Sequence, residues 1–220
     1  MNDIPKKSPT WKVLGILFLL VGMPVIWIMI NKTGVHYSKK LPIWFERELA
    51  PNGDTIYHTV EDFRLVNQYG DSVTLKTYQN KILLVSFFFA SCETVCPLMN
   101  NYISQNIYRE FHKDTNIVFL SFSVDPENDS PAVLRKYAEQ LNASDHWQFL
   151  TGSKTRIYDL AAHSFRIPGA EDAHQGLFHS SKLVLVDKER RIRGIFETET
   201  QNDKSATIDA VRALKLEYKK

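Results

Sequence analysis

The chain has 220 residues, of which 44% are hydrophobic and 24% are charged, a composition that predicts a globular protein and excludes a disordered or fibrous one. Its 27 basic and 25 acidic residues leave a formal net charge of +2, and the basic residues are scattered along the chain. This balance does not predict nucleic acid as a partner. The length allows one domain of ordinary size and an additional segment.

The first distinct element is an uncharged apolar run at residues 13–30, VLGILFLLVGMPVIWIMI. As a helix it is roughly 27 Å long, enough for the hydrocarbon core of a bilayer. A cleaved signal peptide is the alternative, but no small-x-small cleavage signal follows the run. A buried core helix is disfavoured by Gly15, Gly22 and Pro24, which cost less in a membrane helix. We therefore predict one retained transmembrane helix at residues 13–30, after an N-terminal tail at residues 1–12. Lysines on both sides of the run leave its orientation open.

The next segment, residues 31–58, mixes charges and prolines without a period of either 2 or 3.6, which predicts a tether. A folded domain is expected at residues 59–220. It begins with a hairpin signal, because two alternating segments flank turn residues at 67–71. The run at residues 82–90, ILLVSFFFA, is almost continuously apolar, as is typical of a central strand buried on both faces.

Helices and strands alternate along the rest of the domain. A helical pattern follows Pro97, and a second helix has Ser130 as its N-cap and Pro131 in the first helical position. Further strands are predicted at 117–124, 147–150, 183–187 and 192–196, and further helices around 157–161 and 208–214. This order predicts an α/β fold with a mixed central sheet flanked by helices on both faces.

Two cysteines are present, Cys92 and Cys96, and both follow the strand at 82–90. In open α/β sheets the carboxyl ends of the strands are where ligand and active sites occur. Because a residue before proline avoids the helical region, we expect Cys96 to be the N-cap and Pro97 the first helical residue. Both sulfurs then face the positive end of a helix, which stabilises thiolates. The pair is a candidate for redox or metal chemistry, and its spacing alone does not separate the two.

Two ordinary buried cysteines or a purely structural disulfide are the alternatives, although so short a disulfide loop constrains the unfolded chain little. Of the seven histidines, His174 and His179 flank a loop just before the strand at 183–187, and this loop could reach the cysteines. The other histidines are expected in surface, capping or packing roles. A soft cuprous ion accepts two thiolates and an imidazole, so the cysteines and one distant histidine form a sensible copper site.

Four runs of the domain, in this order, resemble the Sco/SenC family of copper chaperones: FFFASCETVCPLMN, FLSFSVDPENDSPAVLRKYAE, FLTGSKTRIYDLA and FHSSKLVLVDKERRIRG. The resemblance covers residues 59–219. It implies a thioredoxin-like fold, a copper ion held by Cys92, Cys96 and His179, and one N-terminal transmembrane anchor. It also implies an extracytoplasmic domain, which makes residues 1–12 a cytoplasmic tail. It also implies a metallochaperone that serves the copper centre of cytochrome c oxidase, with the copper-accepting subunit of that enzyme or another copper protein as its partner.

The sequence departs from the family's pattern beside the expected ligands. Glu93 and Thr94 stand where Pro and Asp are common after the first cysteine. Phe178 stands where an Asp often precedes the distal histidine. These changes leave the ligands intact but alter the local charge, and His174 remains the alternative ligand.

Three other functions use the same fold or the same cysteines. A thiol–disulfide oxidoreductase would use Cys92 and Cys96 as a redox-active pair, and a redox or copper sensor would use the same ligands. Peroxidase activity is disfavoured, because peroxiredoxins have Thr and Pro where this chain has Phe89 and Val85. The Cys-x-x-x-Cys spacing, and the lack of a proline immediately before Leu183, favour a metal carrier over an enzyme.

Overall fold

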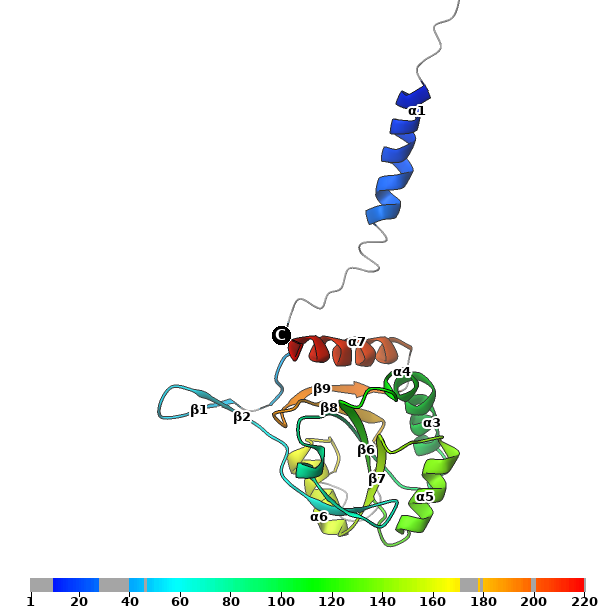
Figure 1. Cartoon of the computed structure of the whole chain (residues 1–220). Coiled ribbons are helices and arrows are strands. Elements are labelled where there is room, and N and C mark those ends of the chain that lie inside the picture. The colour runs from blue at the N-terminus through cyan, green and yellow to red at the C-terminus, as the bar shows by residue number, and fades with distance from the viewer. Residues whose placement is uncertain are drawn as a thin grey trace, which may run out of the picture. The chain divides into compact units, whose positions relative to one another are not determined.

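A mixed β-sheet lies at the centre of the domain. The computed structural model describes residues 10–27, 40–45, 47–170, 178, 180–198 and 201–219. The strands of the sheet are β3 (Arg64–Asn67), β4 (Ser72–Thr74), β5 (Ile82–Phe88), β6 (Ile117–Ser123), β7 (Trp147–Thr151), β8 (Lys182–Val186) and β9 (Ile192–Glu197). Within the described residues they lie in the order β4-β3-β7-β6-β5-β8-β9, with β5, β6 and β7 parallel and the outer strands antiparallel to their neighbours (Figure 1). The predicted mixed α/β sheet is confirmed.

Helices cover both faces of this sheet. They are η2 (Leu75–Tyr78), α3 (Val95–Tyr102), η3 (Ile103–Tyr108), α4 (Arg109–Phe111), α5 (Pro131–Gln140), α6 (Lys154–Asp159), η4 (Leu160–Ser164) and α7 (Gln201–Glu217). Figure 1 shows α3 and α5 on one side of the sheet and α6 on the other. The crossovers from β5 to β6 and from β6 to β7 step in the same direction, so right-handed connections bring α3 and α5 to the same face.

Aromatic side chains fill the space on both faces of the central strands. Every residue of β5 and β6 is buried, which explains their continuous apolar runs. On one face Phe87 stacks on Phe122 with ring centroids 5.2 Å apart. On the other face Phe88 contacts Tyr137 of α5 and Phe149 of β7. Successive residues of β5 therefore support opposite helical layers.

The segment expected as a tether contains two short strands that the sequence analysis did not predict. β1 (Arg47–Leu49) and β2 (Thr55–Tyr57) pair antiparallel, and the Ala50 N–H closes the turn between them by donating to the Asp54 carbonyl at 2.8 Å. Strands of three residues are too short to show a clear period of 2. The compact unit that holds the sheet begins at Lys40.

The N-terminal residues form a separate compact unit, Met1–Lys39. Its described part is helical and consists of α1 (Thr10–Leu17), η1 (Phe18–Gly22) and residues 23–27. Among the residues that the structure describes, no helix is both long and apolar enough to cross a membrane. Residues 28–30 of the predicted span lie outside the described residues.

A buried arginine ties the start of the domain to its last helix. The guanidinium of Arg193 donates to the carbonyl oxygens of Leu41 at 2.7 Å and Pro42 at 3.1 Å. The same group pairs with the carboxylates of Asp187 at 3.1 Å and Glu217 at 2.8 Å. Glu217 also accepts from the Leu41 N–H at 2.7 Å. These bonds hold residues 41–42 against β9 and α7.

Candidate metal centre

The two cysteines lie at the carboxyl end of β5, as predicted. The ladder between the parallel strands β5 and β6 ends at the pair Phe88 and Ser123, and the chain then turns toward α3. Within this turn the Cys92 N–H donates to the Phe89 carbonyl at 3.3 Å. Cys96 follows in the first turn of α3. The site is therefore built from the end of a buried strand and the beginning of a helix.

The helix begins earlier than the sequence indicated. Thr94 occupies the N-cap position and Val95 is the first helical residue, so the prediction that Cys96 is the N-cap is wrong. Pro97 still lies in the first turn, where backbone N–H groups have no intrahelical acceptor and proline loses nothing. The restriction on the residue before proline is a preference, and Cys96 is helical in spite of it.

The backbone N–H of Cys96 donates to the Sγ of Cys92 at 3.4 Å. Both cysteines are free thiols, and both are buried, with 7% and 2% of their surfaces exposed for Cys92 and Cys96 respectively. Burial disfavours the Cys92 thiolate, but hydrogen bonds from Cys96 and Thr94 outweigh it and lower the pKa of Cys92. The predicted activation by amides at a helix N-terminus is thus found at Cys92.

Cys96 behaves in the opposite way. Burial raises the pKa of the Cys96 thiol to about 12, and the negative charges of Cys92 and Asp129 act in the same direction. The expectation that the helix N-terminus lowers both thiol pKa values is wrong for Cys96. Its side chain points into the protein from within the first turn, so desolvation dominates.

A buried carboxylate that the sequence analysis did not single out lies beside the cysteine loop. Asp129 is 1% exposed, and its Oδ2 accepts from the Ser123 hydroxyl at 2.5 Å and from the Ala90 N–H at 3.0 Å. In the sequence, residues 128–131 have the pattern of a turn and a helix cap, so nothing marked Asp129 as a neighbour of the cysteine loop. The available signal was the position of Asp129 just after β6, at the same sheet edge as Cys92.

A second polar pair lies one helical turn beyond Cys96. Asn100 is fully buried, and its side-chain amide donates to the Tyr137 hydroxyl at 2.9 Å. Burial raises the pKa of Tyr137 to about 12, and the charges of Cys96, Cys92 and Asp129 add to this shift. The residues packed next to the cysteines therefore include polar side chains as well as apolar ones.

The expected third ligand, His179, lies outside the described residues, as does the alternative His174. The chain on either side of His179 is described. β8 runs antiparallel to β5, so the segment just before Lys182 approaches the sheet edge at which β5 ends. Phe178 is buried there, with its ring centroid 5.9 Å from that of Phe87.

Three of the remaining histidines have the ordinary roles expected for them. The His58 Nε2 lies 2.8 Å from the carbonyl of Ser164, and the His112 Nδ1 lies 3.0 Å from the carbonyl of Arg109. His163 is an exposed neighbour of Asp159 in its own helix. Within the described part of the chain, no group of three His, Cys, Asp or Glu side chains could hold a metal ion.

The donor set that the described residues provide is a pair of neighbouring soft sulfurs. Thiolate ligands select Cu(I) and other soft ions over hard cations such as Mg²⁺ or Ca²⁺. Cys92 is the more easily ionised sulfur, and a bound cation would favour the thiolate of Cys96 as well. These residues fit Cu(I), and they leave room in the donor set for one more ligand.

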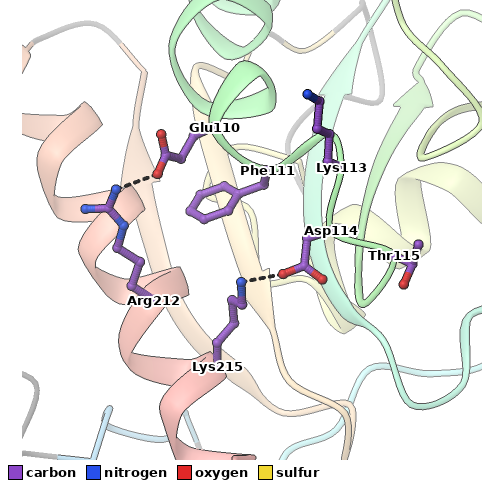
Figure 2. A pocket seen from close by; sticks show the side chains of 7 residues that line it. All are labelled: Glu110, Phe111, Lys113, Asp114, Thr115, Arg212 and Lys215. Atoms are coloured by element: carbon purple, nitrogen blue, oxygen red, sulfur yellow. Dashed lines mark hydrogen bonds and ion pairs between the residues drawn. The ribbon is translucent and has the colours of Figure 1, made fainter.

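A hollow at the opposite edge of the sheet is of a different kind. It has a volume of about 440 Å³ and is lined by Glu110, Phe111, Lys113, Asp114, Thr115, Arg212 and Lys215 (Figure 2). Arg212 pairs with Glu110 at 2.5 Å, and Lys215 pairs with Asp114. Asp114 precedes β6, so this hollow lies at the end of the sheet away from the cysteines. Its paired charges make it a poor ligand site.

Comparison with known proteins identifies relatives of the whole domain. The family model described as SCO1/SenC matches residues 52–215. The SCO1 protein homolog of Bacillus subtilis (strain 168) is 34% identical over 142 residues, which are 63% of this chain and 74% of that protein.

Solved structures agree with this assignment. BsSco, described as a member of the Sco family of cytochrome c oxidase assembly proteins with a disulfide switch, has a TM-score of 0.60 and 31% identity, covering 72% of this chain and 95% of BsSco. ScoI of Bradyrhizobium japonicum with copper bound has a TM-score of 0.57 and 28% identity, covering 71% of this chain and 99% of ScoI. The predicted thioredoxin-like fold and family resemblance are confirmed.

Proposed function

The chain belongs to the SCO1/SenC family, and from this premise we propose that it is a copper metallochaperone that binds one Cu(I) ion through Cys92, Cys96 and His179. Copper is the cargo of such a protein. The thiolates of Cys92 and Cys96 supply two soft ligands, and the imidazole of His179 supplies the third. The fold would contribute the sheet edge at which the three ligands meet.

The observation that carries this proposal is the pair of free thiols, in which the Cys96 N–H donates to the Cys92 Sγ at 3.4 Å. A shared position at the end of β5 gives both sulfurs access to one ion. The course of β8 supports the third ligand, because Phe178 and Ser180 are buried next to the sheet and His179 lies between them in the chain.

The relatives support the destination of the copper. BsSco is described as a cytochrome c oxidase assembly protein, and ScoI of Bradyrhizobium japonicum was solved with copper bound. We propose by analogy that the acceptor is the copper-binding subunit of cytochrome c oxidase. Transfer would proceed by ligand exchange, in which the sulfurs of the acceptor replace Cys92, Cys96 and His179 one at a time.

Membrane anchoring is part of the same proposal. The apolar run at residues 13–30 is long enough to span a bilayer once, and Trp11 and Trp27 near its ends are typical of membrane interfaces. The domain would then act on the extracytoplasmic side, where the copper-accepting subunit is exposed. Extraction of isolated membranes at alkaline pH tests this: an anchored chain stays in the pellet, whereas release into the supernatant contradicts the anchor.

Oxidation would switch copper binding off. When Cys92 and Cys96 reduce the disulfide of a partner by exchange, the partner gains two electrons and two protons and a Cys92–Cys96 disulfide forms. The thiolates are then no longer available as ligands, so the copper is released or cannot bind. Copper loading therefore requires the reduced chain.

Titration of the reduced full-length chain with Cu(I), against a chelator of known affinity, tests the metal site. We expect one copper per chain. Cys96→Ser and His179→Ala should each weaken binding by more than about tenfold, the scale on which even outer-shell partners act. Unchanged affinity in both variants would defeat the assignment.

Two further histidine variants make this test specific. His163→Ala removes an exposed imidazole that neighbours Asp159, and we expect it to bind copper as the unmodified chain does. His174→Ala decides between the two candidate ligands. A loss in His174→Ala with none in His179→Ala would move the third ligand to residue 174.

Thiol–disulfide exchange is the second candidate function, and the unequal thiols favour it. Lowering the pKa of Cys92 makes it the attacking sulfur, while burial keeps a proton on Cys96 until it resolves the mixed disulfide. The two functions share residues but respond differently to His179→Ala. That variant should lose copper binding and retain the exchange reaction.

A further inference from the structure

The carboxylate of Asp129 joins the ends of the two central parallel strands. One oxygen, Oδ2, accepts from the Ser123 hydroxyl at 2.5 Å and from the Ala90 N–H at 3.0 Å. Ser123 is the last residue of β6, and Ala90 lies two residues before Cys92. A single side-chain atom therefore connects the neighbouring strand to the loop that carries the first cysteine.

Backbone hydrogen bonds restrain this loop on both sides of Ala90. The ladder between β5 and β6 ends with the bond from the Val124 N–H to the Phe88 carbonyl at 2.8 Å. Beyond it the Ala90 N–H has no strand partner and bonds to Asp129 instead. Further along the loop, the Cys92 N–H donates to the Phe89 carbonyl, and backbone groups of Phe89, Thr94 and Cys96 bond to the two thiols. Without Asp129 the half-buried Ala90 N–H would lose its acceptor.

Burial of the Asp129 carboxylate is expected to cost stability. Asp129 is 1% exposed, and among the described residues no Lys, Arg or His side chain forms an ion pair with it. Burial raises the pKa of Asp129, and the charge of Asp125 acts in the same direction. Buried groups without a compensating charge destabilise a fold, and they concentrate at functional sites.

We propose that Asp129 is a positioning residue, which fixes the loop at Ala90 and thereby holds the sulfur of Cys92 in place relative to that of Cys96. The part of this inference that concerns copper rests on the proposed function. A metal held by two sulfurs tolerates little displacement of either one. The bond from the Ala90 N–H to Asp129 would therefore help to keep the two sulfurs at the spacing that the ion requires.

Two substitutions of Asp129 distinguish the effect of its hydrogen bonds on the loop from the effect of its charge. Asp129→Ala removes the acceptor for the Ala90 N–H and the Ser123 hydroxyl. Asp129→Asn keeps an acceptor oxygen of nearly the same position and removes the charge. A matched control is Asp187→Asn, which changes a buried carboxylate in the turn after β8, at the opposite edge of the sheet.

The first measurement is hydrogen exchange of the loop amides in the reduced, metal-free full-length chain. We expect exchange at residues 90–92 to rise about tenfold in Asp129→Ala, which corresponds to one lost hydrogen bond to a charged group. In Asp129→Asn the exchange should stay within about threefold of the unmodified chain, since a neutral bond replaces the charged one. Asp187→Asn should leave these amides unchanged.

The second measurement is the Cu(I) affinity, together with the reduction potential of the Cys92–Cys96 disulfide. Asp129→Ala should weaken copper binding about tenfold and shift the potential, and Asp129→Asn should restore both. Equal defects in Asp129→Ala and Asp129→Asn would overturn the proposal in favour of a charge effect. Unchanged loop exchange in Asp129→Ala would overturn it outright.

The role of Asp129 can still be tested if Asp129→Ala does not fold or if the chain binds no copper. If Asp129→Ala does not fold, Ser123→Ala replaces it. We expect a rise in loop exchange of about two- to threefold, because Asp129 loses one of its two donors while the Ala90 N–H keeps its acceptor, and no rise would contradict the proposal. If the unmodified chain binds no copper, the proposed function fails while loop exchange and the disulfide potential still decide the role of Asp129.

Discussion

The backbone N–H of Cys96 donates to the Sγ of Cys92, and this bond gives the two sulfurs different properties. For Cys92, burial disfavours the thiolate, yet the bonds from Cys96 and Thr94 are stronger and the pKa falls. For Cys96, burial dominates and raises the pKa to about 12. A motif that looks symmetric in the sequence is therefore asymmetric in its chemistry.

We expect iodoacetamide to alkylate Cys92 before Cys96 in the reduced chain. The thiolate is the reactive form, so at pH 8 the two labelling rates should differ by more than about tenfold. With rising pH the Cys92 rate should level off below the ordinary thiol value of 9.0, while the Cys96 rate continues to rise. Mass spectrometry of the labelled peptides measures both rates. Equal labelling at pH 8 would contradict the asymmetry, and the urea-unfolded chain should label both cysteines alike.

Tyr78→Phe should stabilise the domain most at high pH. The Tyr78 hydroxyl is buried and has no hydrogen-bond partner among the described residues, and burial raises its pKa above the ordinary value of 10.0. A tyrosine of this kind contributes full stability below its unfolded pKa and loses it as the pH rises toward the folded pKa. Urea unfolding should show a gain of up to about 1 kcal/mol at pH 7 and a larger gain at pH 11. A gain that shrinks with pH would contradict this prediction.

Arg193→Met should destabilise the domain by up to about 3–5 kcal/mol, because it removes a buried cation from Asp187, which keeps only Arg191, and from the half-buried Glu217. It also removes the donors for the carbonyls of Leu41 and Pro42, so protease cleavage near these residues should become faster. Urea unfolding and timed proteolysis measure the two effects.

Arg135→Met is the control for this substitution. Arg135 pairs with Glu139 on the exposed face of α5, and such pairs contribute up to about 1 kcal/mol. Losses of equal size in the two arginine variants would show that burial of the Arg193 cluster has no special effect.

Phe178→Ala should weaken both stability and copper binding. Phe178 is buried against the rings of Phe87 at 5.9 Å and Tyr158 at 5.4 Å, so its removal should cost about 3 kcal/mol. Because Phe178 fixes the chain just before His179, the Cu(I) affinity should fall as well. Phe165→Ala removes another ring that contacts Phe87, and it should cost stability without changing the affinity. Equal Cu(I) affinities in the two variants would show that Phe178 does not position the third ligand.

Most of the fold could be predicted from the sequence, because its central strands are buried on both faces. The runs at β5 and β6 are buried at every position and mostly apolar, and Ser130 caps α5 by accepting from the Val133 N–H. The strands β1 and β2 could not be predicted. Their three-residue runs carry no period, and their pairing depends on the turn between them.

The sequence predicted the two sulfur ligands of the candidate site, but it did not predict the residues that support them. The position of Cys92 and Cys96 follows from one strong strand signal. The start of α3 at Val95 and the opposite behaviour of the two thiols depend on local hydrogen bonds and burial, which no spacing reveals. Asp129 was hidden because Asp is equally common in turns, and only the pairing of β5 with β6 brings it to Ala90.

The bond between the Leu41 N–H and Glu217 spans 176 positions of the chain. At 5–20 residues per second, ribosomal synthesis of that interval takes roughly 9–35 s, so Leu41 exists long before its carboxylate partner does. Contacts so distant in sequence form late and slow the folding reaction. The packing of residues 41–42 against α7 is therefore a late step of folding. Only a chain synthesised as far as Glu217 can complete it.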